Sequence, residues 1–423
     1  MTAEICMMNR LAVVLAADSA TTVSGWVEGK REERYFKGAN KVFQISNMQP
    51  VGLMIYDSAD ILNVPWELII KSFREHINGK SFNLVEDYAK ELFSYLSDNP
   101  RFFPEHIQNA KIVEAARGVL LIWLSSAIDG LEESEHRTAI ETSLRENSER
   151  AIADAVPDCI DPGHIQKVAS DLVSEVEPIA NELLSLCNIE DMSNVTEFCL
   201  GALHEVLKNP PTYLDTTGLV FAGFGDHEIF PAMIEFESQG MVGGKHIFER
   251  KDGIALDHHQ PAYLKAFAQT EMVDTFNAGF SFDAYSSVMS AMGQNLHKFA
   301  ETIAEKSGGK FAAIDDLDSL VQGMRDTIGG VIIDKARKEH SLPLRRVLGV
   351  LPANEMAELA ETLITLQSLK EKVTKPSETV GGPVDVAIIT KHEGLVWVKR
   401  KHFFDADLNS RFALRQAAHH PSA

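Results

Sequence analysis

Short apolar runs that end in polar turns lie near the amino end of the chain. The first is Met7–Thr22, in which an apolar stretch leads into Ala-Asp-Ser and a pair of threonines. A second run begins at Lys41, and a third covers Val51–Asp60. Runs of this length that are closed by turn residues are typical of β-strands. The pattern therefore predicts a strand in each run, with a polar connection between the first two.

Two segments far along the chain have the pattern of β-hairpins. In Gly218–Gly244 an apolar strand ending in Ala-Gly leads to a second strand and a glycine turn, and Val380–Val398 has a similar plan. Helical periodicity occurs in the segments Pro65–Ile77, Asn83–Leu96, Ala262–Lys306, Asp315–Glu339 and Ala353–Val373. Helices that follow hairpin-rich regions bury both sheet faces. We therefore predict an α/β (α+β) fold, a four-layer αββα sandwich of two antiparallel sheets.

The segment from Phe102 to Asn209 has helical periodicity and almost no strand signal. Ile112, Ala116 and Val119, for example, fall on one helix face. We predict an all-helical insertion of about four to six helices. The sandwich domain then consists of residues 1–101 and 210–404, the insertion of residues 102–209, and a C-terminal tail of residues 405–423.

Composition limits the class of protein and its partners. Apolar residues make up 45% of the 423 residues, which is enough for a large core. No apolar run approaches the length of a membrane span, and no signal-peptide pattern is present. The formal net charge is −21, from 61 acidic and 40 basic residues. Because such a surface repels phosphate backbones, we do not expect nucleic acid as a partner, and without an apolar span we do not expect a membrane.

Cysteine and histidine positions predict no disulfide framework, metal site or cofactor. The cysteines are scattered without ligand spacing and indicate free thiols in a reducing compartment, so we expect a cytoplasmic protein; they are Cys6, Cys159, Cys187 and Cys199. The pair His258-His259 is typical of a surface turn. Ser307–Lys310 weakly matches a phosphate-binding loop, but Phe311 stands where the metal-binding hydroxyl belongs, so we predict a turn.

Thr2 has the chemistry of a nucleophile once Met1 is removed. Its hydroxyl would then attack, and its own α-amine, with an ordinary pKa of about 7.7–8.0, would accept the proton. A lysine cation near the amine lowers the pKa of that amine, and a carboxylate holds the lysine in place. Asp18 and Lys41 are the candidates for these two roles.

Together these segments resemble the β-type proteasome subunits and bacterial proteasome-like peptidases, which are N-terminal nucleophile (Ntn) hydrolases. Thr2 falls on the nucleophile, and the Asp of the Val-Val-Leu-Ala-Ala-Asp-Ser segment, Asp18, lies sixteen residues after it. Lys41 falls on the catalytic lysine at the start of the next strand. The resemblance continues, in order, through the two late hairpins.

The resemblance implies roles for further residues. The backbone N–H of Tyr56 would form the oxyanion hole, and the backbone of Thr22 would pair with the substrate. The remaining predicted substrate-binding residues are Thr21, Ala39, Phe43, Met54 and Ser58, four of which (Thr21, Ala39, Phe43 and Met54) would wall the specificity pocket.

The chain also departs from this family. Tyr56 replaces a glycine, and Ser377–Val380 replaces the Asp-x-x-Ser that normally supports the threonine amine. Gly279–Ser287 is the nearest candidate for another supporting serine segment. These differences leave Thr2, Asp18 and Lys41 in place.

The sequence therefore leaves several functions open. The first is a threonine peptidase that cleaves a peptide or protein substrate. The second is an inactive binding or assembly module with the same fold, and the third is a small-molecule amidase of the Ntn superfamily. Because family members stack as rings, we expect a homo-oligomer, and the insertion is a candidate surface for a partner protein.

Overall fold

The computed structural model describes residues 2–27, 30–157, 159–306, 317–374, 380–402, 404–405, 407–411 and 414. Several sequence predictions fall outside these residues: the state of Met1, the turn at Ser307–Lys310, the segment Ser377–Thr379 and much of the C-terminal tail.

The first sheet has five strands in the order β12-β1-β2-β13-β14, and every neighbouring pair is antiparallel. Its strands come from both ends of the chain, because β2 pairs with β1 on one side and with β13 on the other. The strands are β1 (Ala3–Asn9), β2 (Ala12–Ala17), β12 (Ala262–Ala268), β13 (Asp385–Thr390) and β14 (Gly394–Lys399).

The second sheet has five strands in the order β11-β10-β9-β6-β5, again antiparallel throughout. Its strands are β5 (Val42–Gln44), β6 (Val51–Asp57), β9 (Thr217–Gly223), β10 (Ala232–Val242) and β11 (Lys245–Ala255). Two small hairpins stand apart from it: β3 (Ala20–Val27) with β4 (Lys30–Lys37), and β7 (Asp60–Ile61) with β8 (Val64–Pro65).

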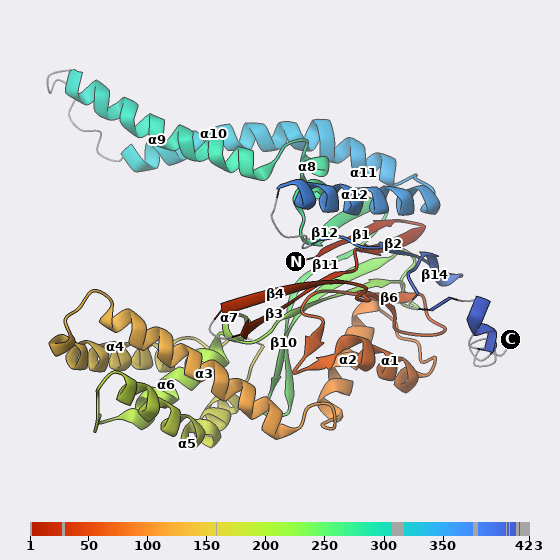
Figure 1. Cartoon of the computed structure of the whole chain (residues 1–423). Helices are drawn as coiled ribbons and strands as arrows, with labels where there is room; N and C mark the ends of the chain where they lie inside the picture. The colour runs from red at the N-terminus through yellow and green to blue at the C-terminus, as the bar shows by residue number, and fades with distance from the viewer. Residues whose placement is uncertain are drawn as a thin grey trace.

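The two sheets share a buried core, and helices cover their outer faces (Figure 1). Met8 and Leu15 of the first sheet pack with Met54 and Val220 of the second. Helices α1 (Trp66–Ile77) and α2 (Val85–Asp98) cover the second sheet, and α11 (Leu342–Leu348) and α12 (Ala353–Thr374) cover the first. The chain is therefore a mixed α/β protein with two antiparallel sheets, in agreement with the predicted sandwich architecture.

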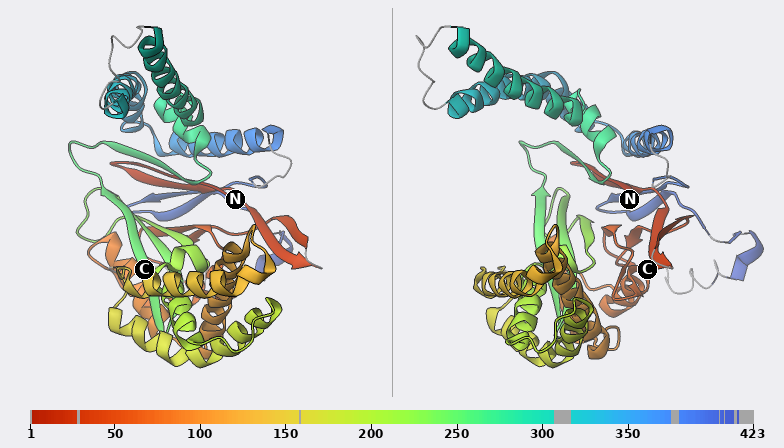
Figure 2. Two further views of the ribbon diagram at one scale, coloured as in Figure 1. Left: turned by 90° about the vertical axis from the view of Figure 1, so that its left-hand side faces the viewer. Right: turned by 60° about the vertical axis from the view of Figure 1, so that its left-hand side comes forward.

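A group of helices lies between α2 and β9 in the chain and has its own hydrophobic core. Figure 2 shows this group at one end of the molecule, away from α9 and α10. Helix α6 is central, because it contacts α3, α4 and α5. The helices are α3 (Glu105–Ile128), α4 (Glu133–Ala153), α5 (Pro162–Leu186), α6 (Val195–Lys208) and α7 (Pro210–Tyr213).

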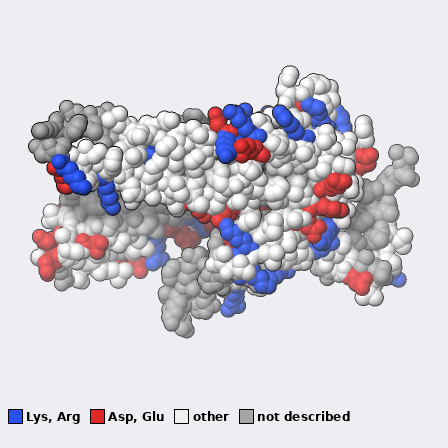
Figure 3. All heavy atoms as spheres, turned by 90° about the horizontal axis from the view of Figure 1, so that it is seen from above, with Lys and Arg blue, Asp and Glu red and all other residues white. Residues whose placement is uncertain are grey.

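Two long helices, α9 (Phe282–Lys306) and α10 (Leu317–Ala336), form an arm that extends from the first sheet (Figure 1). Short elements join it to the sandwich: α8 (Glu271–Ala278) before it and a π-helical turn (Arg337–Ser341) after it. Seen from above, α9–α12 present mostly uncharged side chains, with Lys, Arg, Asp and Glu gathered in a few clusters (Figure 3). A 3₁₀ turn at Asp407–Asn409 follows β14.

Both predicted hairpins are present, but two local predictions are wrong. The predicted helix Ala262–Lys306 begins with β12, because pairing with β1 overrides the helical propensity of its alanine, leucine and lysine residues. The polar connection predicted between Thr22 and Lys41 is instead the β3–β4 hairpin. In both places pairing with another strand, β1 for β12 and β4 for β3, decides the local structure.

Gly201 allows the close approach of α4 and α6, and this generates a stability prediction. A Cβ atom at Gly201 would lie 2.4 Å from Cβ of Ser148 and 2.5 Å from its Cα, whereas nothing lies within 4 Å of the same atom at Gly118 in α3. Gly201→Ala should therefore destabilise the protein by about 1–3 kcal/mol through overpacking. Gly118→Ala should be neutral or stabilise by up to about 1 kcal/mol. Urea unfolding midpoints of the two variants measure this difference, and equal midpoints would contradict the packing argument.

Candidate active site

Thr2 is held at the entrance to β1, between the two sheets. Strand β1 is buried along its length and pairs with β2 and β12. The Thr2 carbonyl oxygen accepts a hydrogen bond of 2.9 Å from the N–H of Gln269, just after β12. The Thr2 residue is 4% exposed. The backbone next to the hydroxyl is therefore fixed by the first sheet.

Asp18 directly follows β2 and binds three backbone N–H groups. Its Oδ1 accepts from Ala3 at 3.0 Å, and its Oδ2 accepts from Ala20 at 3.2 Å and from Gly381 at 2.7 Å. A buried carboxylate is tolerated when donors surround it, and hydrogen bonds to a charged acceptor are the strong ones. Asp18 therefore links the start of β1, the start of β3 and the segment before β13.

Lys41 completes the buried cluster from the position before β5. Its Nζ lies 2.5 Å from Asp18 Oδ1 and 3.3 Å from Glu4 Oε1, and the lysine is 5% exposed. Low exposure means that water does not screen these charges effectively. The structure thus brings Lys41 to Asp18, and Asp18 in turn binds the residue next to Thr2.

Glu4 is a member of this cluster that the sequence reasoning missed. It is fully buried on β1, two residues from Thr2, and so on the same face of the strand. Burial raises the pKa of Glu4 to about 7; the negative charge of Asp18 also raises it, while Lys41 and the hydroxyl of Thr2 lower it. Neither Glu4 oxygen nor Thr2 Oγ1 has a fully formed hydrogen bond among the described residues. The sequence did contain one sign of this role, because Glu4 is an acidic residue within an otherwise apolar strand.

The backbone of Tyr56 takes part in the pairing of β6 with β9. Ser58 N–H donates to the carbonyl of Thr216 at 3.2 Å, and the register pairs Tyr56 with Gly218. In an antiparallel ladder, hydrogen-bonded pairs recur at every second residue. The N–H of Tyr56 therefore points to Gly218 in β9, and this register does not offer it to a substrate.

The side chain of Tyr56 has a structural partner instead. Its hydroxyl donates to Glu235 at 2.6 Å, and Glu235 also binds Lys265 Nζ at 2.5 Å. Its ring stacks on Phe267, with centroids 5.5 Å apart. Burial, followed by the hydrogen bond to Glu235, raises the pKa of the Tyr56 phenol. Tyr56 is thus tied into a polar network between the sheets.

The backbone of Thr22 faces an open strand edge. Ser19 and Gly38 form a hydrogen-bonded pair at 2.9 Å, and the same register pairs Thr22 with Tyr35. Alternation then directs the N–H and C=O of Thr22 away from β4. Among the described residues β3 pairs only with β4, so this edge is open to an added strand.

The other predicted substrate-binding residues do not gather at one place. Phe43 packs in the core under α1 and α2, whereas Met54 is fully buried between the sheets, on the other face of the second sheet. The Ser58 hydroxyl donates to the carbonyl of Asp60 at 2.9 Å. Thr21 lies in β3, opposite Phe36 of β4, and Ala39 follows β4, where its N–H donates to the carbonyl of Ser19. The alternation of β5 and β6 therefore prevents the predicted pocket from forming as a single wall.

Two further segments bear on the predicted site. Gly279–Ser287, the candidate for a supporting serine, forms the C-terminal cap of α8 and the first turn of α9, at the base of the arm. Gly381, which follows the replaced Asp-x-x-Ser segment, supplies its N–H to Asp18.

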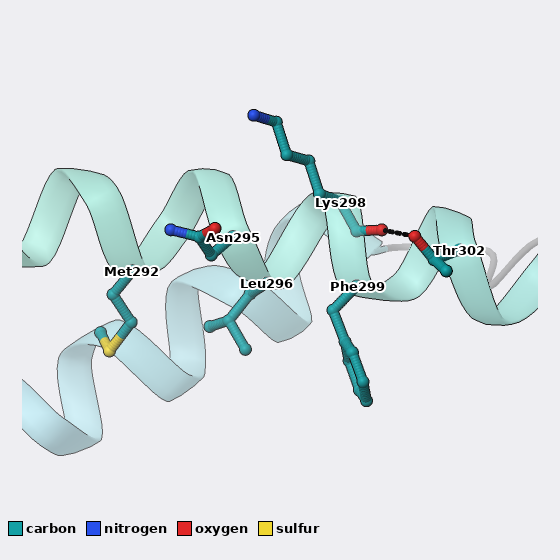
Figure 4. Close-up of a pocket in the computed structure, with 6 residues that line it drawn as sticks. All are labelled: Met292, Asn295, Leu296, Lys298, Phe299 and Thr302. Atoms are coloured by element: carbon teal, nitrogen blue, oxygen red, sulfur yellow. Dashed lines mark hydrogen bonds between the residues drawn. The ribbon is translucent and has the colours of Figure 1, made fainter.

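Within the described ranges, no group of three or more His, Cys, Asp and Glu side chains is arranged to hold a metal ion. No helix in the described part of the chain is long and apolar enough to cross a membrane. A surface hollow of about 490 Å³ lies on α9, lined by Met292, Asn295, Leu296, Lys298, Phe299 and Thr302 (Figure 4). Its lining comes from a single helix and contains no pair of catalytic groups.

Comparisons with known proteins give little beyond this geometry. No family model matches the chain, and no curated protein matches it. Among solved structures, the chain is similar to the Anbu (Gly-1) mutant from Hyphomicrobium sp. strain MC1, with 10% sequence identity, a TM-score of 0.27, and coverage of 100% of this chain and 99% of that one. A TM-score this low carries no weight for fold or activity, so the proposals below rest on the residues themselves.

The raised pKa of Glu4 predicts a dependence of stability on pH. Below pH 4.5 the carboxyl group is protonated in both the folded and the unfolded chain. Between pH 4.5 and about 7 the unfolded chain loses this proton first, so folding becomes less favourable, by up to about 3 kcal/mol. Glu4→Gln removes this titration.

The free energy of unfolding of the variant, relative to wild type, should therefore increase by about 3 kcal/mol between acidic and neutral pH. Urea unfolding at a series of pH values measures it. A difference between the two proteins that is constant with pH would contradict the assignment of a buried, titrating Glu4.

Proposed function

We propose that this chain is a proteasome-like Ntn hydrolase that cleaves peptide bonds with Thr2 as nucleophile, after removal of Met1. The observation that supports it best is the buried contact of Lys41 with Asp18 beside Thr2. Each of these residues alone has an ordinary structural explanation. Their convergence from β1, the β2–β3 connection and the start of β5 is what the chemistry requires.

The proposed mechanism uses the free α-amine of Thr2. The Thr2 hydroxyl attacks the substrate carbonyl while the amine accepts its proton through a water molecule, and the amine then returns a proton to the leaving nitrogen. Lys41 keeps the amine neutral by lowering the pKa of that amine, and Asp18 holds the ammonium group of Lys41 in place. Water finally hydrolyses the ester on Thr2.

The oxyanion donor is reassigned to Asp57. Ile55 N–H donates to the carbonyl of Lys41 at 2.9 Å, on the side of β6 that faces β5. The N–H of Asp57, two residues further on, faces the same side, beyond the residues of β5 that pair with β6. A backbone N–H at this place can stabilise the charge that develops on the attacked carbonyl.

A peptide fits the site better than a small amide. The open edge of β3 exposes the backbone of Thr22, and an extended peptide adds to such an edge as a further strand. We also propose that residues 1–101 and 210–404 form the hydrolase domain, with residues 102–209 as an insertion that is a candidate surface for a partner protein, and that the protein is a cytoplasmic homo-oligomer.

The second candidate is an inactive binding or assembly module. The 4% exposure of Thr2 and the dispersal of Phe43 and Met54 favour it. A small-molecule amidase remains the third.

Substitution of Thr2 separates these functions. In protein whose intact mass shows loss of Met1, Thr2→Ala should abolish peptide turnover and labelling by electrophiles directed at N-terminal threonines, because no other hydroxyl has the amine within reach. Thr302→Ala, an exposed threonine on α9, should leave both unchanged. Equal activity in wild type and Thr2→Ala would exclude the mechanism. A folded wild type that starts at Thr2 and reacts with no probe would support the inactive module.

A further inference from the structure

Glu4 has no role in the mechanism above, although it lies inside the same cluster. We propose that Glu4 is a positioning residue that, through its charge, sets the protonation state of the Thr2 α-amine together with Lys41. This inference rests on the proposed function, because it concerns the amine of an N-terminal threonine.

The geometry brings Glu4 to both partners. Side chains two residues apart on a strand share a face, so Glu4 and Thr2 both project between the sheets, as Cys6 and Met8 do further along β1. Lys41 Nζ lies 3.3 Å from Glu4 Oε1 and 2.5 Å from Asp18 Oδ1, so a single ammonium group serves two carboxylates. The amine and the hydroxyl of Thr2 are joined through only two carbon atoms, and the hydroxyl faces Glu4 closely enough to lower the pKa of that carboxyl group.

Among the described residues, the charged side chains that act on Glu4 are Asp18, with one negative charge from the β2–β3 connection, and Lys41, with one positive charge from the start of β5. Removal of Met1 would add the Thr2 amine as a third group. With Glu4 protonated, the charges of Asp18 and Lys41 cancel. With Glu4 ionised, the cluster has a net negative charge next to the amine.

The sign of the effect follows from this balance. A negative charge favours the protonated amine and so raises its pKa. Burial brings the pKa of Glu4 to about 7, close to the range in which an α-amine titrates. The two groups therefore titrate as a coupled pair, and the ammonium form of the Thr2 amine loses its proton at a higher pH than it would beside a neutral residue.

The test measures the pKa of the Thr2 amine directly and needs no turnover. The probe is competitive acylation of the α-amine with acetic anhydride across a pH series, read by mass spectrometry of the N-terminal peptide. The protein starts at Thr2, verified by intact mass; where Met1 is retained, it is prepared from a fusion cleaved directly before Thr2. Glu4→Gln should lower the amine pKa by about one unit.

Two matched variants complete the design. Glu197→Gln changes an exposed glutamate of α6 and should leave the amine pKa unchanged. Glu4→Asp keeps an ionisable carboxyl group and should move the amine pKa back towards the wild-type value. Circular dichroism of each variant verifies that it is folded.

An amine pKa in folded Glu4→Gln that equals or exceeds the wild-type value would overturn the inference. This result is distinguishable from failure of the proposed function, because peptide turnover by wild type and Thr2→Ala decides the latter independently. In an active enzyme, the rising limb of kcat/KM with pH should move to lower pH in Glu4→Gln by the same amount.

Discussion

The carboxylate of Asp18 is the interaction on which the rest of the site depends. It accepts three backbone hydrogen bonds and the ammonium group of Lys41 within a volume that excludes water. Removing water from a carboxylate costs several kcal/mol unless donors replace it. Here the donors come from segments distant in sequence, so the charge is tolerated only when both sheets and the segment before β13 are in place.

Glu4 presents the opposite situation in the same cluster. Among the described residues its oxygens lack formed hydrogen bonds, and the Lys41 ammonium group that lies near it also serves Asp18. A residue selected for stability alone would be apolar at this position, as its neighbours Ile5 and Cys6 are. Groups that cost stability persist at functional sites, where their charge is used. Asp18 is thus surrounded by donors, whereas burial without such donors raises the pKa of Glu4 to about 7.

The fold could be predicted from the sequence where local pattern and tertiary pairing agree. The hairpin Gly218–Gly244 forms as predicted, because its apolar strands and glycine turns permit few alternatives. Strand β12 was missed because its alanine, leucine and lysine residues favour a helix locally, and only the edge of β1 makes it extended. The β3–β4 hairpin was missed because its polar residues have little apolar alternation.

The candidate site was likewise predictable where local sequence pattern decides the structure and not where tertiary pairing does. The contact between Asp18 and Lys41 was expected from the resemblance to Ntn hydrolases, which could be followed because each residue directly flanks a recognisable strand. Other predicted roles depended on which face of the sheet a side chain occupies and on which neighbouring strand a backbone N–H faces, as for Tyr56, Phe43 and Met54. The pairing register of the strands fixes both, and the sequence alone does not reveal that register. Glu4 lies in an otherwise apolar, buried strand, and its acidic side chain was the one sign in the sequence that it belongs to the cluster.

The hydrogen bond from Gly381 to Asp18 has a consequence for how the protein is made. The two residues are separated by 363 positions, and β13, which follows Gly381, fills the place beside β2. During synthesis, nearly the whole chain must leave the ribosome before Asp18 acquires its last backbone donor. A nascent chain whose amino-terminal strands have already been synthesised therefore lacks the full hydrogen bonding of Asp18, and the order of translation delays completion of the surroundings of Thr2 until β13 is available.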